Sequence, residues 1–355
     1  YMPREGGGYE FAYRLISPYA GFLAGWMWVF SNIFIGAAVS LGFAQHFAAF
    51  FPFLPATVVA AVLCLSFIFL NYVGVRQSAM VNNALVVAKI SILLFFIALG
   101  LSFINLNNFN PFMPRGFSGI LEGAALIFFA YGGYARVTVM AEEVKEASHT
   151  IPRAIILALT ISIVLYVFIG FVAVGLVGSQ TLAASGSPLS DAIGVTGNSV
   201  AVFVLSLGAM IATASVLLMT ILGVSRMTFA MARNGQLPTF LGRIHPRFQT
   251  PHYAVLITGL LSSVLVFGGF SRVVAVGTFS LLFHHALVNL AAVRLRAEKR
   301  RYPVFVSVLG LLLCLTLLVF LSTDAWVIGV AGLIVGAFYY ALGIKKQKIT
   351  RAFLS

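Results

Sequence analysis

Ten long runs of apolar residues constrain this chain more than any other sequence feature. Each run is 18 to 28 residues long, and a helix needs about 20 apolar residues to cross a bilayer core. We predict membrane-spanning helices at 20–47, 53–73, 79–104, 119–143, 153–178, 199–225, 253–270, 272–294, 303–322 and 325–343. The twelve prolines fall in the connections or near the ends of the runs, which supports these boundaries because proline removes a hydrogen bond inside a helix.

Composition leads to the same fold class. The 355 residues are 61% hydrophobic and 9% charged, whereas soluble domains average about 45–50% apolar and about 25% charged residues. A soluble enzyme and a disordered chain are therefore excluded, and the sequence predicts an all-α polytopic membrane protein with about ten transmembrane helices.

The positive charges lie predominantly on one side of the predicted membrane. When successive connections are placed on alternate sides, eighteen of the 22 Lys and Arg fall on the side of both chain ends, and only Arg115 and Arg272 fall opposite. Positive charge accumulates in cytoplasmic loops, so we expect both ends to be cytoplasmic. The net charge of +13 is then explained by Lys and Arg in cytoplasmic loops, and we expect no nucleic-acid partner.

This topology divides the chain simply. We predict one transmembrane domain over 1–355, with a cytoplasmic N-terminal segment at 1–18, a cytoplasmic loop at 226–252 and a cytoplasmic tail at 344–355.

A glycine pair lies near the middle of the fourth run. Gly132 and Gly133, flanked by Tyr131 and Tyr134, favour a local unwinding of the helix. Unwound backbone at this depth is tolerated where it lines a cavity, and its free carbonyls can bind a cation or an ammonium group. The alternative is a glycine pair that serves close helix packing.

A single lysine lies at mid-depth in the third run. Lys89 lies about ten residues into this run, and a lysine at the bilayer centre costs at least about 2.5 kcal/mol on insertion scales. Burial disfavours its charged form, which suits a group that gains and loses a proton. The alternative is a structural lysine bound to helix-end carbonyls.

Sequence motifs of enzymes and metal proteins are absent. Cys64 and Cys314 lie inside apolar runs, and adjacent His284 and His285 do not face each other on a helix. We found no zinc-ligand spacing, phosphate-binding loop or nucleophile motif. We therefore expect no enzyme activity, metal or cofactor.

Several short motifs together resemble one family. They are Pro3-Arg4-Glu5-Gly6-Gly7-Gly8-Tyr9 with Gly21-Phe22-Leu23-Ala24-Gly25-Trp26, then Phe128-Phe129-Ala130-Tyr131-Gly132-Gly133-Tyr134, Ala141-Glu142-Glu143-Val144-Lys145 and Ile151-Pro152-Arg153, and finally Ala232-Arg233-Asn234-Gly235-Gln236-Leu237-Pro238 with His245-Pro246 and Thr250-Pro251. This set resembles the amino acid permeases of the amino acid–polyamine–organocation family nearly end to end.

The resemblance implies a fold of five helices plus five inverted helices, followed by two more. The first run here is similar to the family's third helix. The chain is therefore expected to lack the first two helices, including the glycine-rich stretch that holds the substrate carboxylate, and to be N-terminally incomplete.

The resemblance also assigns site residues. It implies substrate contacts from Phe129, Ala130, Tyr131, Gly132, Gly133 and Tyr134, with Phe129 as the aromatic residue that closes over the substrate, and from Asn32 and Gly36. Lys89 falls where proton-coupled relatives carry a lysine in place of a sodium ion, and Ser215 is the candidate hydroxyl opposite it.

Two departures from the family pattern limit this transfer. Ala135 and Arg136 stand where the family often has a glutamate after the aromatic residue, and Glu146-Ala147 replaces the usual Asn-Pro. The first change removes the basis for assigning a substrate preference.

The resulting hypothesis is a secondary active transporter for an amino acid or related amine, working by alternating access and coupled to protons. We expect it in a prokaryotic cytoplasmic membrane. One alternative is an obligate exchanger in which Lys89 is structural. Another is a non-transporting membrane sensor of the same fold; a sensor would carry a soluble domain, but the longest polar connection, 226–252, has only 27 residues.

Overall fold

The protein is helical throughout the part of the chain that the structure describes. The computed structural model describes residues 7–74, 79–134, 144–297 and 300–354, which contain no strand. The longer helices are α2 (Pro18–Ala48), α3 (Ala56–Val73), α4 (Ala79–Leu101), α5 (Gly116–Tyr131), α7 (Ala147–Ala184), α9 (Ser199–Arg233), α10 (His252–Leu265), α11 (Phe270–Arg294), α12 (Val304–Val319) and α13 (Thr323–Leu354). The short helices are α1 (Gly8–Leu15), α8 (Pro188–Gly194), and the 3-10 turns η1 (Leu106–Phe109), η2 (Gly132–Tyr134), η4 (Thr239–Gly242) and η5 (Val266–Gly268).

The ten predicted spans correspond to these ten longer helices, the fourth as far as it is described. Within the described residues, eight helices are long and apolar enough to cross a membrane, and two shorter apolar helices cover His252–Gly268 and Val304–Val319. The predicted all-α polytopic fold class is confirmed. The predicted start at 153 was too late, because α7 begins at Ala147, whereas the predicted end at 178 coincides with a kink inside α7, where Gly178 has non-helical backbone angles.

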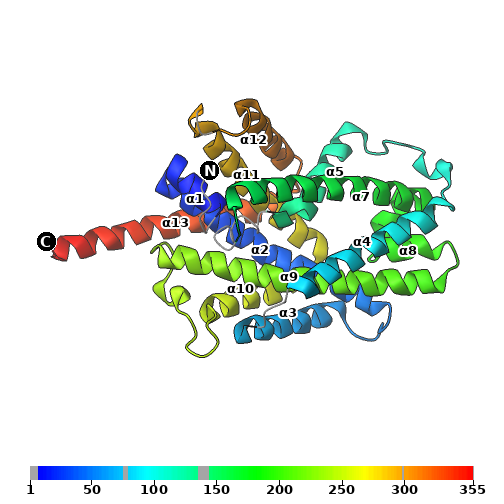
Figure 1. Cartoon of the computed structure of the whole chain (residues 1–355), viewed down its shortest axis with the longest axis horizontal. Coiled ribbons are helices and arrows are strands. Elements are labelled where there is room, and N and C mark those ends of the chain that lie inside the picture. The colour runs from blue at the N-terminus through cyan, green and yellow to red at the C-terminus, as the bar shows by residue number, and fades with distance from the viewer. Residues whose placement is uncertain (1–6, 75–78, 135–143, 298–299, 355) are drawn as a thin grey trace.

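The helices lie side by side in a bundle (Figure 1). The amphipathic helix α1 and the C-terminal end of α13 lie toward the same end of the bundle, at the left of the view, while α8 lies at the opposite end.

Helices α2 and α11 pack against each other at the centre, and polar contacts link α2 to its neighbours. Three hydrogen bonds join it to α11, α13 and α10: Ser31 Oγ donates to Gly277 O, Trp26 Nε1 to Gly332 O, and Ser262 Oγ to Ile33 O, each at 2.9 Å. Lipid offers no hydrogen-bonding partners, so polar side chains in such a bundle are satisfied internally.

Helix α7 lies at the periphery. Large apolar side chains along it, including Val164, Val167 and Phe168, are about half exposed. Such exposure is unfavourable in water but suits contact with acyl chains, which supports a membrane location.

Pro152 lies inside the first turns of α7, whereas the sequence placed it just before the helix. Proline cannot donate to the carbonyl four residues earlier, which belongs to Ser148. Arg301 Nη1 donates to this carbonyl at 2.7 Å. A side chain from the connection between α11 and α12 therefore replaces the missing helix hydrogen bond.

The short helix α1 was not predicted, because eight residues give too little periodicity to recognise. It packs on α2 and α11, and its Tyr9 is buried. Asn234 Nδ2 donates to Tyr9 Oη at 3.1 Å, which connects α1 to the C-terminal end of α9. Burial raises the pKa of Tyr9 to about 12, so its hydroxyl stays neutral at physiological pH.

The contact between α1 and α2 depends on Gly21. A methyl group added there would lie 2.5 Å from Cα of Tyr13 and 2.8 Å from its backbone nitrogen. Backbone atoms cannot move aside as side-chain ends do, so we expect Gly21→Ala to lower the free energy of unfolding by about 1–3 kcal/mol. Thermal denaturation in detergent checks this.

The matched control is Gly123→Ala in α5, where an added methyl group meets nothing within 4 Å. This control is expected to denature at the wild-type temperature. Equal denaturation temperatures for Gly21→Ala and wild type would contradict the packing of α1 on α2.

Candidate functional site

The fourth predicted span changes conformation at the glycine pair. The α-helix α5 ends at Tyr131, and the chain continues as a 3-10 turn from Gly132 to Tyr134. Gly132 is buried and Gly133 is exposed. The predicted departures at Ala135 and Arg136, and the acidic pair Glu142-Glu143, lie outside the described residues.

Helix α11 packs directly on this turn. A methyl group on Gly132 would lie 2.6 Å from Leu281 Cδ2, and one on Gly277 would lie 3.0 Å from the ring of Phe129. The Phe129 ring therefore lies over Gly277, whose carbonyl accepts the hydrogen bond from Ser31. The close approach of α5 and α11 requires a glycine on each helix.

Two tyrosines of the turn contact other helices. The rings of Tyr131 and Tyr166 of α7 are 5.2 Å apart, and those of Tyr134 and His285 of α11 are 5.6 Å apart. Ala130, between these aromatic residues, is exposed. The turn thus lies between α7 and α11.

Of the two predicted residues on α2, neither has a described contact with the turn. Asn32 is buried, and its Nδ2 donates to Trp28 O at 2.9 Å. Gly36 faces α10, where an added methyl group would lie 2.8 Å from Ser262 Oγ. Their role in lining a substrate pocket stays a prediction.

Lys89 and Ser215 are hydrogen-bonded to each other. Lys89 Nζ donates to Ser215 Oγ, and this hydroxyl in turn donates to Ala212 O at 3.3 Å. The structure thus joins the lysine of α4 to the serine of α9 that was chosen as its partner. The function of the pair is not established by the contact itself.

A cavity of about 420 Å³ lies beside Lys89. Its polar lining comes from Lys89, His46, Tyr166 and Thr213, and its apolar lining from α2, α4, α8 and α9. Tyr166 lines the cavity and also contacts Tyr131, so it connects the cavity wall to the turn at the end of α5.

Two adjacent histidines are buried in α11. His284 Nδ1 lies 2.9 Å from Ala24 O, and His285 Nδ1 lies 2.8 Å from Leu281 O. A carbonyl only accepts hydrogen bonds, so each Nδ1 carries the proton. Throughout the described ranges, no three His, Cys, Asp or Glu side chains gather in a way that could hold a metal ion.

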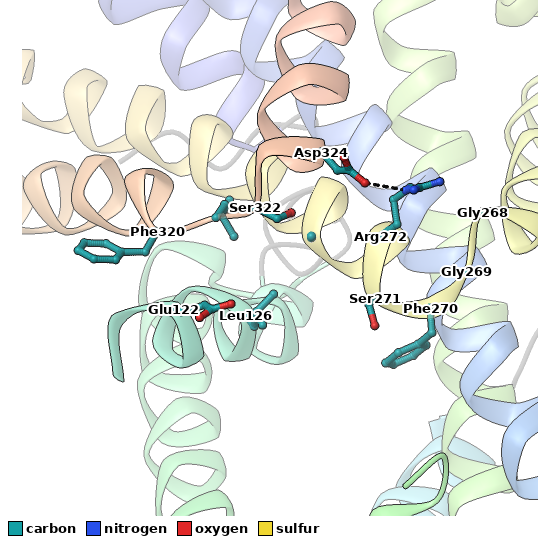
Figure 2. A pocket seen from close by; sticks show the side chains of 12 residues that line it. Glu122, Leu126, Gly268, Gly269, Phe270, Ser271, Arg272, Phe320, Ser322 and Asp324 are labelled. Atoms are coloured by element: carbon teal, nitrogen blue, oxygen red, sulfur yellow. Dashed lines mark hydrogen bonds and ion pairs between the residues drawn. The ribbon is translucent and has the colours of Figure 1, made fainter. Parts of the chain in front are cut away.

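A second pocket, of about 530 Å³, lies between the middle of α5, the connection from α10 to α11 and the connection from α12 to α13 (Figure 2). Arg272 Nε lies 3.0 Å from Asp324 Oδ2, and Glu122 is paired with Arg115 at 3.3 Å. All four side chains are about half exposed or more, so these pairs are screened by solvent and add little stability.

The contacts of Tyr166 and Gly277 with the end of α5, and of Leu281 and His285 with the turn, were not predicted from the sequence. Each residue lies inside an apolar run. Its residue type alone does not distinguish a side chain that packs between helices from one that contributes to a binding site. The motifs that resemble the family include none within α11, so the resemblance did not identify these contacts either.

A bundle of membrane-length helices, with one apolar helix that ends in a 3-10 turn and a half-buried lysine beside a cavity, is typical of a polytopic membrane transporter. A family model described as amino acid permease matches residues 1–344. The chain therefore belongs to the amino acid permease family and is an integral membrane protein.

Individual relatives match over nearly the whole chain. The branched-chain amino acid permease of Bacillus subtilis is 29% identical over 378 residues, covering 98% of this chain and 81% of the relative. The methylthioribose transporter of the same organism is 30% identical with the same coverage. The vacuolar cationic amino acid transporter 4 of Arabidopsis thaliana is 31% identical over 78% of this chain and 50% of its own length.

Proposed function

We propose that this protein is a secondary active transporter that moves an amino acid or related amine by alternating access, coupled to protons through Lys89. The observation that carries the coupling is the hydrogen bond between Lys89 and Ser215 at the edge of the 420 Å³ cavity. A lysine at this depth is costly when charged, and a neutral hydroxyl partner leaves its charge uncompensated. Such a lysine is suited to release its proton.

The turn after α5 is the proposed substrate site. The last carbonyls of an α-helix lack partners within the helix and carry partial negative charge, so those near Tyr131 can bind a substrate ammonium group. Phe129 would contact the substrate side chain. Helix α2 also lies close to this ring, because an added methyl group on Gly277 would meet both Phe129 Cε2 at 3.0 Å and Phe34 Cβ at 3.3 Å.

The apolar side chains around Phe129 and Gly132 favour a neutral, apolar substrate. Phe129, Leu281 and Phe34 offer aromatic and aliphatic surface and no countercharge for a cationic side chain. The names of the relatives suggest three classes to compare, namely branched-chain amino acids, cationic amino acids and methylthioribose.

An obligate exchanger is the second candidate. In that case the hydrogen bond to Ser215 would fix Lys89 as a structural group, and transport would require substrate on both sides. The sensor alternative has less support, because the family consists of permeases.

We place the protein in a prokaryotic cytoplasmic membrane, with both ends cytoplasmic. The bias of Lys and Arg supports this orientation, as do the bacterial relatives.

A substrate panel tests the proposal. The full-length protein in proteoliposomes, with an acidic exterior, is expected to accumulate leucine or valine. Unlabelled branched-chain amino acids are expected to compete for uptake at least about tenfold better than lysine or arginine, because a site without a countercharge disfavours a charged side chain. Uptake of radiolabelled substrate measures this. Stronger competition by lysine, or by methylthioribose, would contradict the neutral amino acid assignment.

A further inference from the structure

The cavity beside Lys89 reaches a second titratable side chain, His46. His46 lies in the last turn of α2, and Lys89 lies near the middle of α4. Both line the same 420 Å³ cavity. The proposed function uses Lys89 and leaves His46 without a role.

The shape of the cavity follows α9. Its lining residues on α9 are Leu205, Gly208, Ala209, Ala212, Thr213 and Val216. This spacing is one face of a helix, and eleven residues at 1.5 Å per residue extend about 16 Å along the axis. At the Val216 end, Ser215 binds Lys89. At the other end, Pro188 and Leu189 of α8 join His46 in the lining.

The cavity is therefore an elongated space that runs from the end of the bundle where α2 ends and α8 lies down to Lys89. The distribution of Lys and Arg predicts that this end is the outer one. Because liquid water occupies about 30 Å³ per molecule, a volume of about 420 Å³ has room for several waters in a row.

One ring nitrogen of His46 is left unpaired. Its Nδ1 is buried and has no hydrogen-bonding partner among the described residues. Asp191 lies on α8, whose Pro188 and Leu189 line the cavity together with His46. The Asp191 carboxylate accepts from Ser187 Oγ at 3.2 Å and from Ser185 Oγ.

The other groups on the packed helices are few. Lys89 comes from α4, the Tyr166 hydroxyl from α7, and the Thr213 hydroxyl from α9. Thr213 donates to Ala209 O at 2.7 Å, so its hydroxyl is oriented within its own helix. The titratable groups facing the cavity are thus His46 at one end, Lys89 at the other and Tyr166 between.

We propose that His46 relays protons from the outer solution to Lys89 through this cavity. Imidazolium at His46 gives its proton to cavity water, water passes a proton to the free amine of Lys89, and the neutral imidazole is then protonated again from outside. This relay rests on the proposed proton coupling at Lys89.

Chemical rescue tests the relay. In proteoliposomes of the full-length protein with an acidic exterior, His46→Ala is expected to slow proton-driven uptake by at least about tenfold, because a positioned proton donor contributes a factor of about 10²–10⁴. Imidazole added only outside is expected to restore much of the rate. Counterflow exchange without a pH gradient is expected to persist, which shows that the variant is folded.

Two matched variants complete the design. His149→Gln, an exposed histidine at the start of α7, is expected to behave as wild type. His46→Gln keeps a polar side chain of similar size, so the volume of the cavity changes little. This variant is nevertheless expected to lose uptake.

The outcomes separate the two proposals. If Lys89→Ala flattens the pH dependence of uptake but His46→Ala does not slow uptake, the relay is wrong and proton coupling stands. If both His46 variants lose uptake and exchange equally, or if imidazole does not restore the rate, the role of His46 is structural. If Lys89→Ala leaves the pH profile unchanged, the proton coupling on which the relay rests is wrong.

Discussion

Lys89→Ala is expected to abolish proton-driven accumulation while leaving counterflow exchange in place. Removal of the amine leaves Ser215 without a donor and the cavity without its proton acceptor at mid-depth. Wild-type uptake is expected to rise as the outside becomes more acidic, because protonation of Lys89 from outside precedes each cycle. In the variant this dependence flattens, and accumulation falls by at least about tenfold, the scale of a lost proton-transfer group.

Two further lysine variants sharpen this result. Lys89→Arg keeps a cation of similar length that does not release its proton, so it is expected to lose accumulation as Lys89→Ala does. Lys145→Ala removes an exposed lysine and is expected to leave the pH profile unchanged. An unchanged profile in Lys89→Ala would support the obligate exchanger, in which this lysine is structural.

Gly132→Leu is expected to abolish substrate binding in the full-length protein. The position is buried, and even the first carbon of a side chain would lie 2.6 Å from Leu281 Cδ2. A leucine also favours continuation of the α-helix over the 3-10 turn, which would withdraw the carbonyls near Tyr131 from a ligand. Equilibrium binding of radiolabelled substrate to purified protein measures the loss.

Paired substitutions separate the two physical causes. Gly133 is exposed, so Gly133→Leu adds helix propensity with less steric conflict, and it is also expected to abolish binding. Gly132→Ala combined with Leu281→Ala makes room for the added methyl group while retaining the propensity effect. If this double variant binds normally, packing against α11 is the cause and the carbonyl site is wrong.

The membrane spans were predictable because lipid imposes a length and a composition on every helix. Thus α2 and α11 begin within two residues of the predicted positions. The start of α7 was not predictable, since Pro152 normally argues against a helix interior. Its tolerance depends on Arg301, which donates to Ser148 O from a distant part of the chain. A tertiary contact of this kind leaves no local signal.

The candidate site was predictable only in part. The glycine pair indicated where α5 stops, and the resemblance selected both Lys89 and Ser215. The cavity that connects Lys89 to His46 was not predictable, because its walls come from five helices whose relative positions the sequence does not encode locally. His46 itself lies near the end of an apolar run, where a histidine at the membrane interface is unremarkable.

The three hydrogen bonds on α2 have a mechanical consequence. Because Ser31, Trp26 and Ile33 each connect α2 to a different neighbour, α2 cannot slide or rotate against α11, α13 or α10 without breaking a bond that lipid would not replace. These four helices are therefore expected to move as one rigid body, and the relative motion of a transport cycle would take place at its boundary.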